Sequence, residues 1–315
     1  MGNIIVLWDS MLDVYMYGHT NRKNPESTAP LLTVDREEFI LWWASNVAHN
    51  LSSLYGGEVT IGLISIVAKD SNGENFSQLC TEANISLFPL FTGAPTITKT
   101  RFVNGQRKSQ LLRVDCEVKI PLTDQYIEEM IDILNKRHPE FIVISDYNKG
   151  LITWDMVSSL KKFVINKWIK ILVDTKPQNL QYFDWVYLIK PNFKEFCEMV
   201  GHPWMEENEE ANTDENVELY GKQLVGEHKV NLVVTRWHKW SSLVTLEWDV
   251  YHFPPIEDIS VFDVTGAWDT FIATLVYALE KKYSLPAAVK LANKASWIVI
   301  RKFGTATLTS GELWI

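Results

Sequence analysis

A turn of small residues that opens a helical run contains the residues best placed to do chemistry. Residues 263–270 read Asp-Val-Thr-Gly-Ala-Trp-Asp-Thr, and the apolar run FIATLVYALEKK follows. Free N–H groups at the start of such a helix bind anions. Asp269 lies in the first helical turn, where a carboxylate can cap the helix. It could equally take a proton from a hydroxyl that attacks a phosphate held by those N–H groups, and the pattern leaves both roles open.

Short apolar runs alternate with amphipathic stretches along the chain, which predicts the elements that must position this turn. We expect strands at residues 3–8, 59–66, 141–145, 170–174, 186–190 and 231–235. We expect helices at residues 35–54, 72–83, 123–137, 153–166, 192–199, 214–225, 267–282 and 285–300. Strands rich in Ile and Val, separated by helices, are typical of an α/β fold with a mostly parallel sheet covered on both faces.

Polar residues stand where many of these predicted strands end. They are Asp9, Ser145, Asp174, Asn192 and Thr235. Any one of them could simply begin a loop. Ligands of open α/β sheets bind at the carboxyl ends of the strands, however, so the series as a whole predicts a shared cleft.

Two segments break the alternation and predict a small β lid over that cleft. Residues 14–36 are polar and contain Gly18, Pro25 and Pro30. Residues 93–119 read as a strand, a turn and a second strand, and Asn104-Gly105 at the turn is a typical hairpin signal. We therefore expect one domain, residues 1–315, with the lid formed by these two segments.

Composition narrows the class of protein. The chain has 315 residues, 46% of them hydrophobic and 22% charged, which is ordinary for a globular protein. It contains no apolar run long enough for a membrane span, and its start lacks the basic region of a signal peptide. A net charge of −9 without a dense Lys/Arg stretch argues against nucleic acid as a partner. Three widely spaced cysteines disfavour a zinc site and fit a reducing cytoplasm. P-loop, dinucleotide-binding, zinc-protease and serine-hydrolase motifs are absent.

Sequence motifs along nearly the whole chain resemble those of the ribokinase-like (PfkB) carbohydrate kinases. DVTGAWDTF is similar to that family's second signature, D-T/V-x-G-A-G-D-T/A-F. PTITKTRF and SDYNKG resemble the branch of D-glycero-β-D-manno-heptose-7-phosphate kinases. The segments that carry the resemblance run from residue 5 to residue 313: VLWDSMLDVYMYG, NRKNPESTAPLL, ASNVAHNLSSL, PTITKTRFV, QLLRVDCE, ISDYNKGLI, LVDTKP, KPNFKEF, VVTR, DVTGAWDTFIATL and KFGTATLTSGEL.

The resemblance implies a fold, a reaction and partners. The fold would be a ribokinase-like three-layer α/β/α sandwich with a β lid, through which two copies would form a homodimer. The reaction would be phosphoryl transfer from ATP, with Mg²⁺, to the anomeric hydroxyl of D-glycero-D-manno-heptose 7-phosphate in the cytoplasm, on the route to nucleotide-activated heptose. K⁺ is a further candidate ion. The nucleotidyltransferase portion of some relatives would be missing. Another sugar or nucleoside kinase of this fold, and a non-catalytic sugar-phosphate or nucleotide binding protein, stay open as alternatives.

On the sugar side, the resemblance assigns roles residue by residue. Asp269 would be the base, and Gly266, Ala267 and the backbone at Trp268 would form the anion hole for the transferring phosphoryl group. Asp13 and Asn46 match sugar-contacting positions, with Asp9 beside them. The candidates for binding the 7-phosphate are Arg22, Lys99 and Arg101, each of which could instead be a solvated surface charge.

On the nucleotide side, Asn192 and Glu195 match the family's N-x-x-E, which organises Mg²⁺ through water. The same spacing is typical of a helix capping box, and both roles could hold. Thr235 and Arg236 would open the loop over the nucleotide phosphates. The other candidate nucleotide-binding residues are Asp174, Lys176, Asp263, Thr265 and Asn293, with the turn at 302–307 on the adenine side.

Tryptophan stands where the family has glycine. The chain holds 13 Trp against 15 Gly, and the substituted positions are Trp8, Trp42, Trp43, Trp240 and Trp268, with Trp168, Trp185 and Trp297 less clear. Glycine at all eight would bring its content to about 7%, the average for proteins. Glycine serves where φ is positive or where backbone approaches a ligand, and a bulky residue forced into such a backbone costs about 1–3 kcal/mol. At position 268 an indole would also be expected to fill the phosphate space.

Three explanations of these tryptophans stay open. The codon UGA is read as Trp in some genetic codes and as Gly in others, so the cell could place glycine at these positions. The chain could instead be a pseudokinase that binds without transferring, or an active kinase with rebuilt loops. The retained polar residues, among them Asp269 and Asn192, speak against decay.

Overall fold

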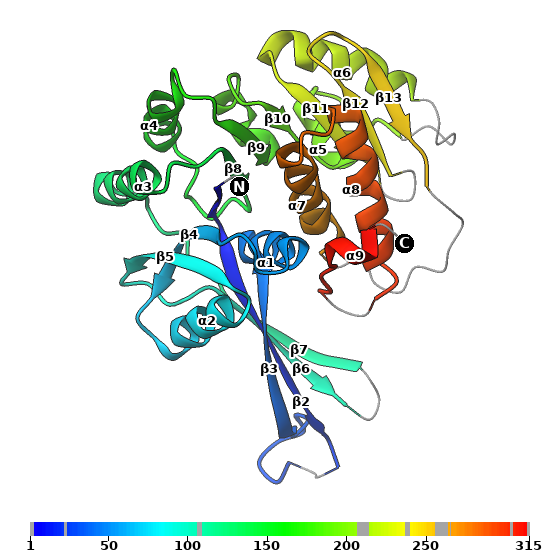
Figure 1. Ribbon diagram of the computed structural model, residues 1–315. Helices are drawn as coiled ribbons and strands as arrows, with labels where there is room; N and C mark the ends of the chain where they lie inside the picture. The colour runs from blue at the N-terminus through cyan, green and yellow to red at the C-terminus, as the bar shows by residue number, and fades with distance from the viewer. Residues whose placement is uncertain are drawn as a thin grey trace.

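The computed structural model describes residues 3–21, 24–105, 109–206, 214–236, 240–255, 264, 266–302 and 305–313, and it is built on a nine-stranded sheet (Figure 1). The strand order is β13-β12-β11-β10-β9-β8-β1-β4-β5. Pairing is parallel from β11 to β5, and β12 and β13 add an antiparallel edge. The strands are β1 (Ile4–Trp8), β4 (Ile61–Ala68), β5 (Ile85–Thr92), β8 (Phe141–Ser145), β9 (Lys170–Asp174), β10 (Leu188–Ile189), β11 (Asn231–Thr235), β12 (Ser241–Val244) and β13 (Val250–Phe253). The predicted mostly parallel sheet is thus confirmed.

Helices cover both faces of this sheet. The β1 residues Ile4 and Val6 pack into one hydrophobic cluster, and Ile5 and Leu7 into the other. This is why the strand is apolar throughout rather than alternating. Helices of the first cluster are α1 (Ala44–Tyr55), α2 (Ser71–Glu82), α7 (Ala267–Glu280), α8 (Leu285–Val299) and α9 (Ser310–Leu313). Those of the second are α3 (Asp124–Arg137), α4 (Trp154–Val164), α5 (Phe193–Met199) and α6 (Glu215–His228), with a 3₁₀ turn at Pro177–Tyr182.

A second, four-stranded sheet forms the lid, which projects from the body of the molecule (Figure 1). Its order is β3-β2-β6-β7, with β2 (Ser10–His19), β3 (Thr33–Trp43), β6 (Thr98–Asn104) and β7 (Ser109–Cys116). The predicted hairpin corresponds to β6 and β7, which pair antiparallel. The lid also reaches further along the chain than residue 36, because all of β3 belongs to it.

The predicted helix at 35–54 is wrong over its first half. Residues 33–43 form β3, and helix α1 begins only at Ala44. Glu37, Glu38 and Leu41 favour a helix locally, but antiparallel pairing with β2 overrides that preference. The consequence for the site is direct, because the β3–α1 junction faces the carboxyl end of β1: the Ala44 N–H donates to the Asp9 carbonyl at 3.0 Å.

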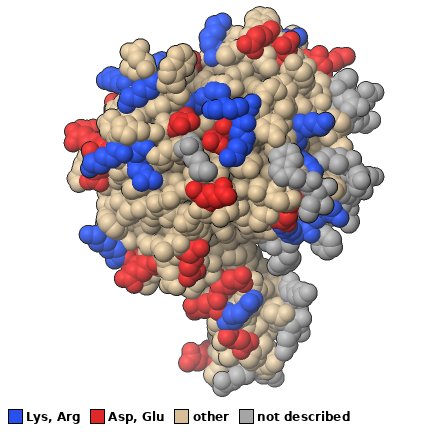
Figure 2. All heavy atoms as spheres, in the orientation of Figure 1, with Lys and Arg blue, Asp and Glu red and all other residues tan. Residues whose placement is uncertain are grey.

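The surface mixes charges of both signs. On the face shown in Figure 2, the coloured Lys and Arg side chains are interspersed with Asp and Glu. Among the described residues, none of the helices has both the length and the apolar character that crossing a membrane requires.

Candidate active site

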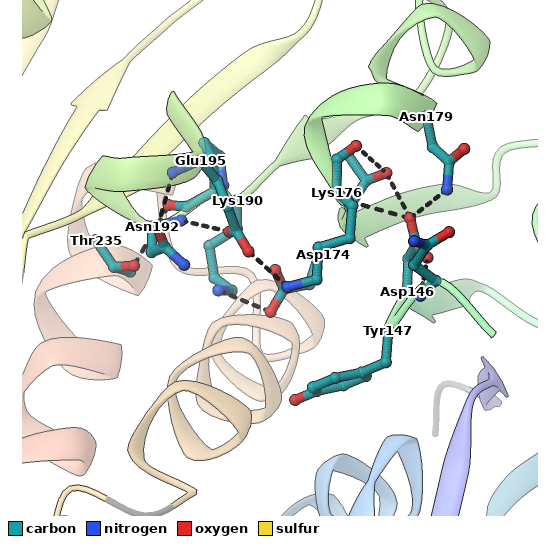
Figure 3. A network of polar contacts seen from close by, with 12 residues as sticks. Asp146, Tyr147, Asp174, Lys176, Asn179, Lys190, Asn192, Glu195 and Thr235 are labelled. Carbon is teal, nitrogen blue, oxygen red and sulfur yellow. Dashed lines mark hydrogen bonds and ion pairs between the residues drawn. The ribbon is translucent and has the colours of Figure 1, made fainter. Parts of the chain in front are cut away.

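Polar side chains from several strands meet along one edge of the central sheet (Figure 3). Asp174 ends β9, Thr235 ends β11, and Asn192, just past β10, bridges to Thr235 in parallel. Asp9 and Asp146 directly follow β1 and β8, and the Asp146 N–H donates to the Asp174 carbonyl at 2.9 Å. The residues expected to share a cleft thus lie along one edge.

Asp269 lies at the start of α7, near this edge. The helix follows Gly266, whose φ of 77° places it in the left-handed region, and Asp269 is 4% exposed. Its Oδ2 accepts from Asn46 Nδ2 at 2.7 Å, and its Oδ1 accepts from the Tyr147 hydroxyl at 3.3 Å. Within the described part of the chain these side chains, and not N–H groups of α7, are its hydrogen-bond partners. The arrangement suits a group that exchanges a proton better than a helix cap.

A buried polar chain between α1 and α7 orients the Asn46 amide. Asn50 Nδ2 donates to Asn46 Oδ1 at 3.2 Å, and the Thr270 hydroxyl donates to Asn50 Oδ1 at 2.8 Å. The Asn46 oxygen is therefore occupied, and its NH₂ group faces Asp269. A Cβ at Gly266 would lie 2.8 Å from Asn46 Nδ2, so a residue without a side chain is required there for α1 to come this close.

The surroundings of Asp269 tune its proton affinity. Burial raises the pKa of Asp269 to about 7, the hydrogen bond from Asn46 opposes that rise, and the charge of Asp174 adds to it. A general base works best when its pKa lies near the operating pH. With a pKa near 7, Asp269 is therefore suited to accept the proton of a neutral hydroxyl.

Tyr147 is a residue of the site that was not expected from the sequence, where the motif SDYNKG was its only signal. Asp9 Oδ2 accepts from the N–H groups of Tyr147 at 2.7 Å and of Lys149 at 3.2 Å, which fixes the loop. Asp146, the residue before Tyr147, accepts three hydrogen bonds at its Oδ2. The donors are the Thr175 hydroxyl at 3.0 Å, the Lys176 N–H and the Asn179 amide. Asp9, expected beside the sugar-contacting residues, thus anchors the loop that carries Tyr147.

Replacing Tyr147 with Phe should shift the pH dependence of turnover. The Tyr147 hydrogen bond lowers the pKa of Asp269, so Tyr147→Phe raises that pKa. We expect the acidic limb of kcat/KM against pH to move to higher pH. The matched control is Tyr126→Phe, whose hydroxyl donates only to the Phe91 carbonyl at the surface. An unchanged limb in both variants would show that Tyr147 does not act on the base.

Two lysine–carboxylate pairs lie at the carboxyl ends of β9 and β10, among the residues predicted to bind the nucleotide (Figure 3). Lys190 Nζ is 2.8 Å from Asp174 Oδ2, and Lys176 Nζ is 2.5 Å from Glu195 Oε1. Asn192 and Glu195 also form the expected capping box, with reciprocal bonds of 2.9 and 3.0 Å. Lys190, only 2% exposed, was not expected from the sequence. Among the described residues there is no cluster of three or more metal-ligating side chains.

The basic residues Arg101 and Lys99 of the lid are each paired with a carboxylate. Arg101 Nε donates to both carboxylate oxygens of the buried Asp13, at 3.0 and 3.2 Å. Lys99 Nζ lies 3.3 Å from Glu117 Oε1, and Lys149 Nζ lies 2.5 Å from Glu117 Oε2. Lys149, which no motif argument singled out, therefore joins Lys99 on one carboxylate.

The Trp43 indole lies between these groups. Its ring stacks on Tyr147 with centroids 4.6 Å apart, and Lys99 Nζ and Lys149 Nζ lie 5.2 and 5.3 Å from its centre. Trp268, in contrast, is half-buried in the first turn of α7 and packs against the first hydrophobic cluster. The contact of the Trp43 indole with Tyr147 and the two lysines was not expected from the sequence.

The remaining nucleotide-side candidates differ in their accessibility. Thr235 is buried, and its hydroxyl donates to the Pro191 carbonyl. Arg236 directly follows β11, and its guanidinium is fully buried, with Nη1 3.1 Å from Asp214 Oδ2. Asn293 accepts from the Ser241 hydroxyl, while its buried Nδ2 has no partner among the described residues. Arg22, Asp263 and Thr265, and part of the 302–307 turn, lie outside the described residues.

Known proteins share both sequence and fold with this chain. A family model, "pfkB family carbohydrate kinase", matches residues 43–310. Proteins named bifunctional protein HldE are 33% identical in Haemophilus influenzae strain PittEE and 31% identical in Trichlorobacter lovleyi. The match covers 98% of this chain but only 62% and 61% of those relatives.

Solved structures agree on the fold. A crystal structure of Escherichia coli phosphofructokinase-2 in complex with potassium has a TM-score of 0.80, covering 100% of this chain and 97% of that one at 17% identity. Thermotoga maritima ribokinase has a TM-score of 0.71 at 15% identity, covering 100% of this chain and 98% of that one. The fold is therefore ribokinase-like. With the family match over most of its length, the chain belongs to the PfkB family of carbohydrate kinases, which are phosphotransferases with an alcohol group as acceptor.

Proposed function

We propose that this kinase transfers a phosphoryl group from ATP to the anomeric hydroxyl of D-glycero-D-manno-heptose 7-phosphate, giving the 1,7-bisphosphate, in the synthesis of nucleotide-activated heptose. The observation that carries the proposal is the buried Asp269, whose pKa is raised to about 7 and whose carboxylate accepts from Asn46 and Tyr147. Lys99 and Arg101 on the lid support a phosphorylated sugar. The similarity to relatives named HldE supports the choice of sugar.

Asp269 would take the proton of the attacking hydroxyl. At the helix start formed by Gly266, Ala267 and Trp268, the N–H groups of Gly266 and Trp268 would face the charge that develops on the transferring phosphoryl group, where one such donor is worth about 10²–10³ in rate. The Ala267 N–H donates to the Val264 carbonyl at 3.2 Å and would have to leave it to join them. Asn46 and Tyr147 hold the carboxylate in place. Closure of the lid would exclude water and limit hydrolysis of ATP.

The nucleotide would lie along the carboxyl edge of β9, β10 and β11. Mg²⁺ keeps several of its waters when it binds beside substrate phosphates. Asn192 and Glu195 would hold the ion through such waters, with Asp174 near the phosphates. The ion would neutralise charge on the phosphates. Asn293 Nδ2, which lacks a partner in the described part of the chain, is a donor suited to an adenine ring. K⁺ would be an accessory ion, as in the potassium complex of phosphofructokinase-2.

The sugar's phosphate should be required for efficient turnover. Charge-assisted hydrogen bonds contribute about 1.5–3 kcal/mol each. We therefore expect kcat/KM to fall by at least about 100-fold for the same heptose without its 7-phosphate. ADP release with heptose 7-phosphate, free heptose, fructose 6-phosphate and ribose would measure this. Equal rates with and without the phosphate would favour another sugar kinase of this fold.

A homodimer formed through the lid would fit the surface of β7. Leu112 and Val114 are 57% and 48% exposed there, which is unusual for apolar residues in a sheet and supports a protein partner. Light scattering would give the mass in solution. The location would be the cytoplasm.

The second candidate is a binding protein without transferase activity, favoured by the Trp43 indole that fills the space between Tyr147 and the lid. It predicts stabilisation by sugar phosphate or nucleotide without release of ADP, both in this sequence and in a Trp43→Gly, Trp268→Gly variant.

A further inference from the structure

Four tryptophans have a backbone conformation that tryptophan does not favour. Trp8, Trp43, Trp240 and Trp248 have φ of 87°, 60°, 65° and 72°. Positive φ is uncommon outside glycine, and for a bulky residue it is a marked outlier. Asparagine, histidine and lysine occupy the other non-glycine positions with positive φ that the structure describes, and of these His138 and Lys229 are left-handed helix C-caps, where such residues do occur.

Trp43 is the most demanding of the four. With φ 60° and ψ −130°, it lies outside even the left-handed helical region. These angles are near those of the first central residue of a type II′ turn, a position where glycine dominates. They are required here because the chain must turn from β3 into α1 within one residue, while Ala44 N–H donates to Asp9 and the Ser45 hydroxyl donates to the Trp42 carbonyl.

Trp248 also has a backbone conformation that favours glycine, and it is not among the positions found by comparison with the family. The Trp248 N–H donates to the Thr245 carbonyl at 2.9 Å, and the Thr245 N–H donates to the Asp249 carbonyl at 3.0 Å. This closes a three-residue loop between β12 and β13, whose last residue takes the left-handed conformation that glycine normally supplies. The Trp248 side chain is 57% exposed, so packing does not explain its presence.

Trp8 combines positive φ with an unsatisfied donor. It is 0% exposed at the end of β1, and its indole N–H is buried without a partner among the described residues. Buried donors are nearly always paired in native proteins. At Trp240, the carbonyl accepts from the Arg236 N–H at 2.6 Å, which fixes the loop geometry regardless of the side chain.

We propose that the protein, as its cell makes it, carries glycine at positions 8, 43, 240 and 248. One cause serves all four: UGA codons that the cell reads as glycine. The backbone makes no such demand at Trp42 or Trp268, whose φ is not positive, nor at the fully exposed Trp168. These positions are therefore left out of the proposal.

Glycine at position 43 would change the site most. Without the indole, the face of Tyr147 and the ammonium groups of Lys99 and Lys149 border an open space beside Asp269. This step rests on the proposed function: such a space, with two cations that share the single carboxylate of Glu117 and so keep a net positive charge, fits an anionic group of a sugar phosphate. Lys149 then becomes a second ligand for that group.

Codons and peptide masses test the proposal directly. The gene should read UGA at all four positions. Peptides of the protein purified from its own cells should be lighter than the tryptophan form by the exchange of indolylmethyl for hydrogen at each position. UGG codons, or tryptophan in any of these four peptides, would overturn the proposal. Neither result depends on the substrate, so a failed heptose assay would leave this conclusion untouched.

Stability gives a second, independent measurement. In the chain with tryptophan, Trp248→Gly should raise the midpoint of thermal unfolding by about 2 °C, because it relieves the strained φ without loss of core packing. The matched control is Trp168→Gly, an exposed position with φ that is not positive, where glycine should give no rise. If the two variants behave alike, positive φ does not strain Trp248 and the proposal loses its physical basis.

Discussion

Asp269→Asn should lower kcat by about 10²–10⁴-fold, the range that general-base catalysis contributes. An amide keeps the shape of the side chain and can still accept from Asn46, but it cannot take a proton from the sugar. Binding of ATP should stay within a few-fold of the parent, because the N–H groups of α7 that we propose to bind phosphate are unchanged. Steady-state kinetics with separate titrations of both substrates would measure the two effects.

The control for this variant is Asp155→Asn. Asp155 also lies in the first turn of a helix, α4, but its side chain is exposed rather than buried. It should leave kcat unchanged. Turnover that survives Asp269→Asn would show that the base is a different group.

Asp269→Asn should also change how the stability of the folded protein depends on pH. The pKa of Asp269 is raised from 3.8 to about 7 by burial, so the folded state favours the neutral carboxyl. The contribution of Asp269 to the free energy of unfolding is therefore fully present below pH 3.8, and it is lost as the pH rises through 7. Above pH 7, Asp269→Asn should therefore unfold with a free energy on the order of 2–4 kcal/mol larger than the parent. Urea unfolding at pH 5 and pH 8 would show the difference growing with pH.

Some strands of this fold can be predicted from the sequence and others cannot. The strands β1, β8, β9 and β11 were predictable because strands buried on both faces are apolar without interruption. β3 was not predictable, because its residues favour a helix locally. Only its pairing with β2, which local sequence preference does not reveal, makes it a strand.

The site divides in the same way. Asp269 and Asn46 were predicted from motifs, and the structure brings them to 2.7 Å across 223 residues of chain. Lys190 was missed because its partner Asp174 lies on the neighbouring strand, where the register of β9 and β10 alone decides the contact. Tyr147 was missed because its position depends on how Asp9 holds the loop.

Trp43→Gly, made in the chain with tryptophan, should raise kcat/KM for the sugar phosphate. The indole fills the space between Tyr147 and the two lysines, so a sugar must lie away from Asp269 or displace the ring. A misplacement of 1 Å between reacting groups already costs about 10²-fold in rate, and we expect a gain of at least that size. Rates of ADP formation at subsaturating sugar phosphate would measure it.

The matched control for this gain is Trp185→Gly. That indole is partly buried, packs into the second hydrophobic cluster and donates to the Tyr182 carbonyl. Its removal should lower stability and leave kcat/KM unchanged, so a general loosening of the fold cannot imitate the effect at 43. A fall in kcat/KM for Trp43→Gly would mean that the ring itself holds the sugar against Tyr147. The chain would then be an active kinase with a rebuilt pocket, and tryptophan at position 43 would be part of its chemistry.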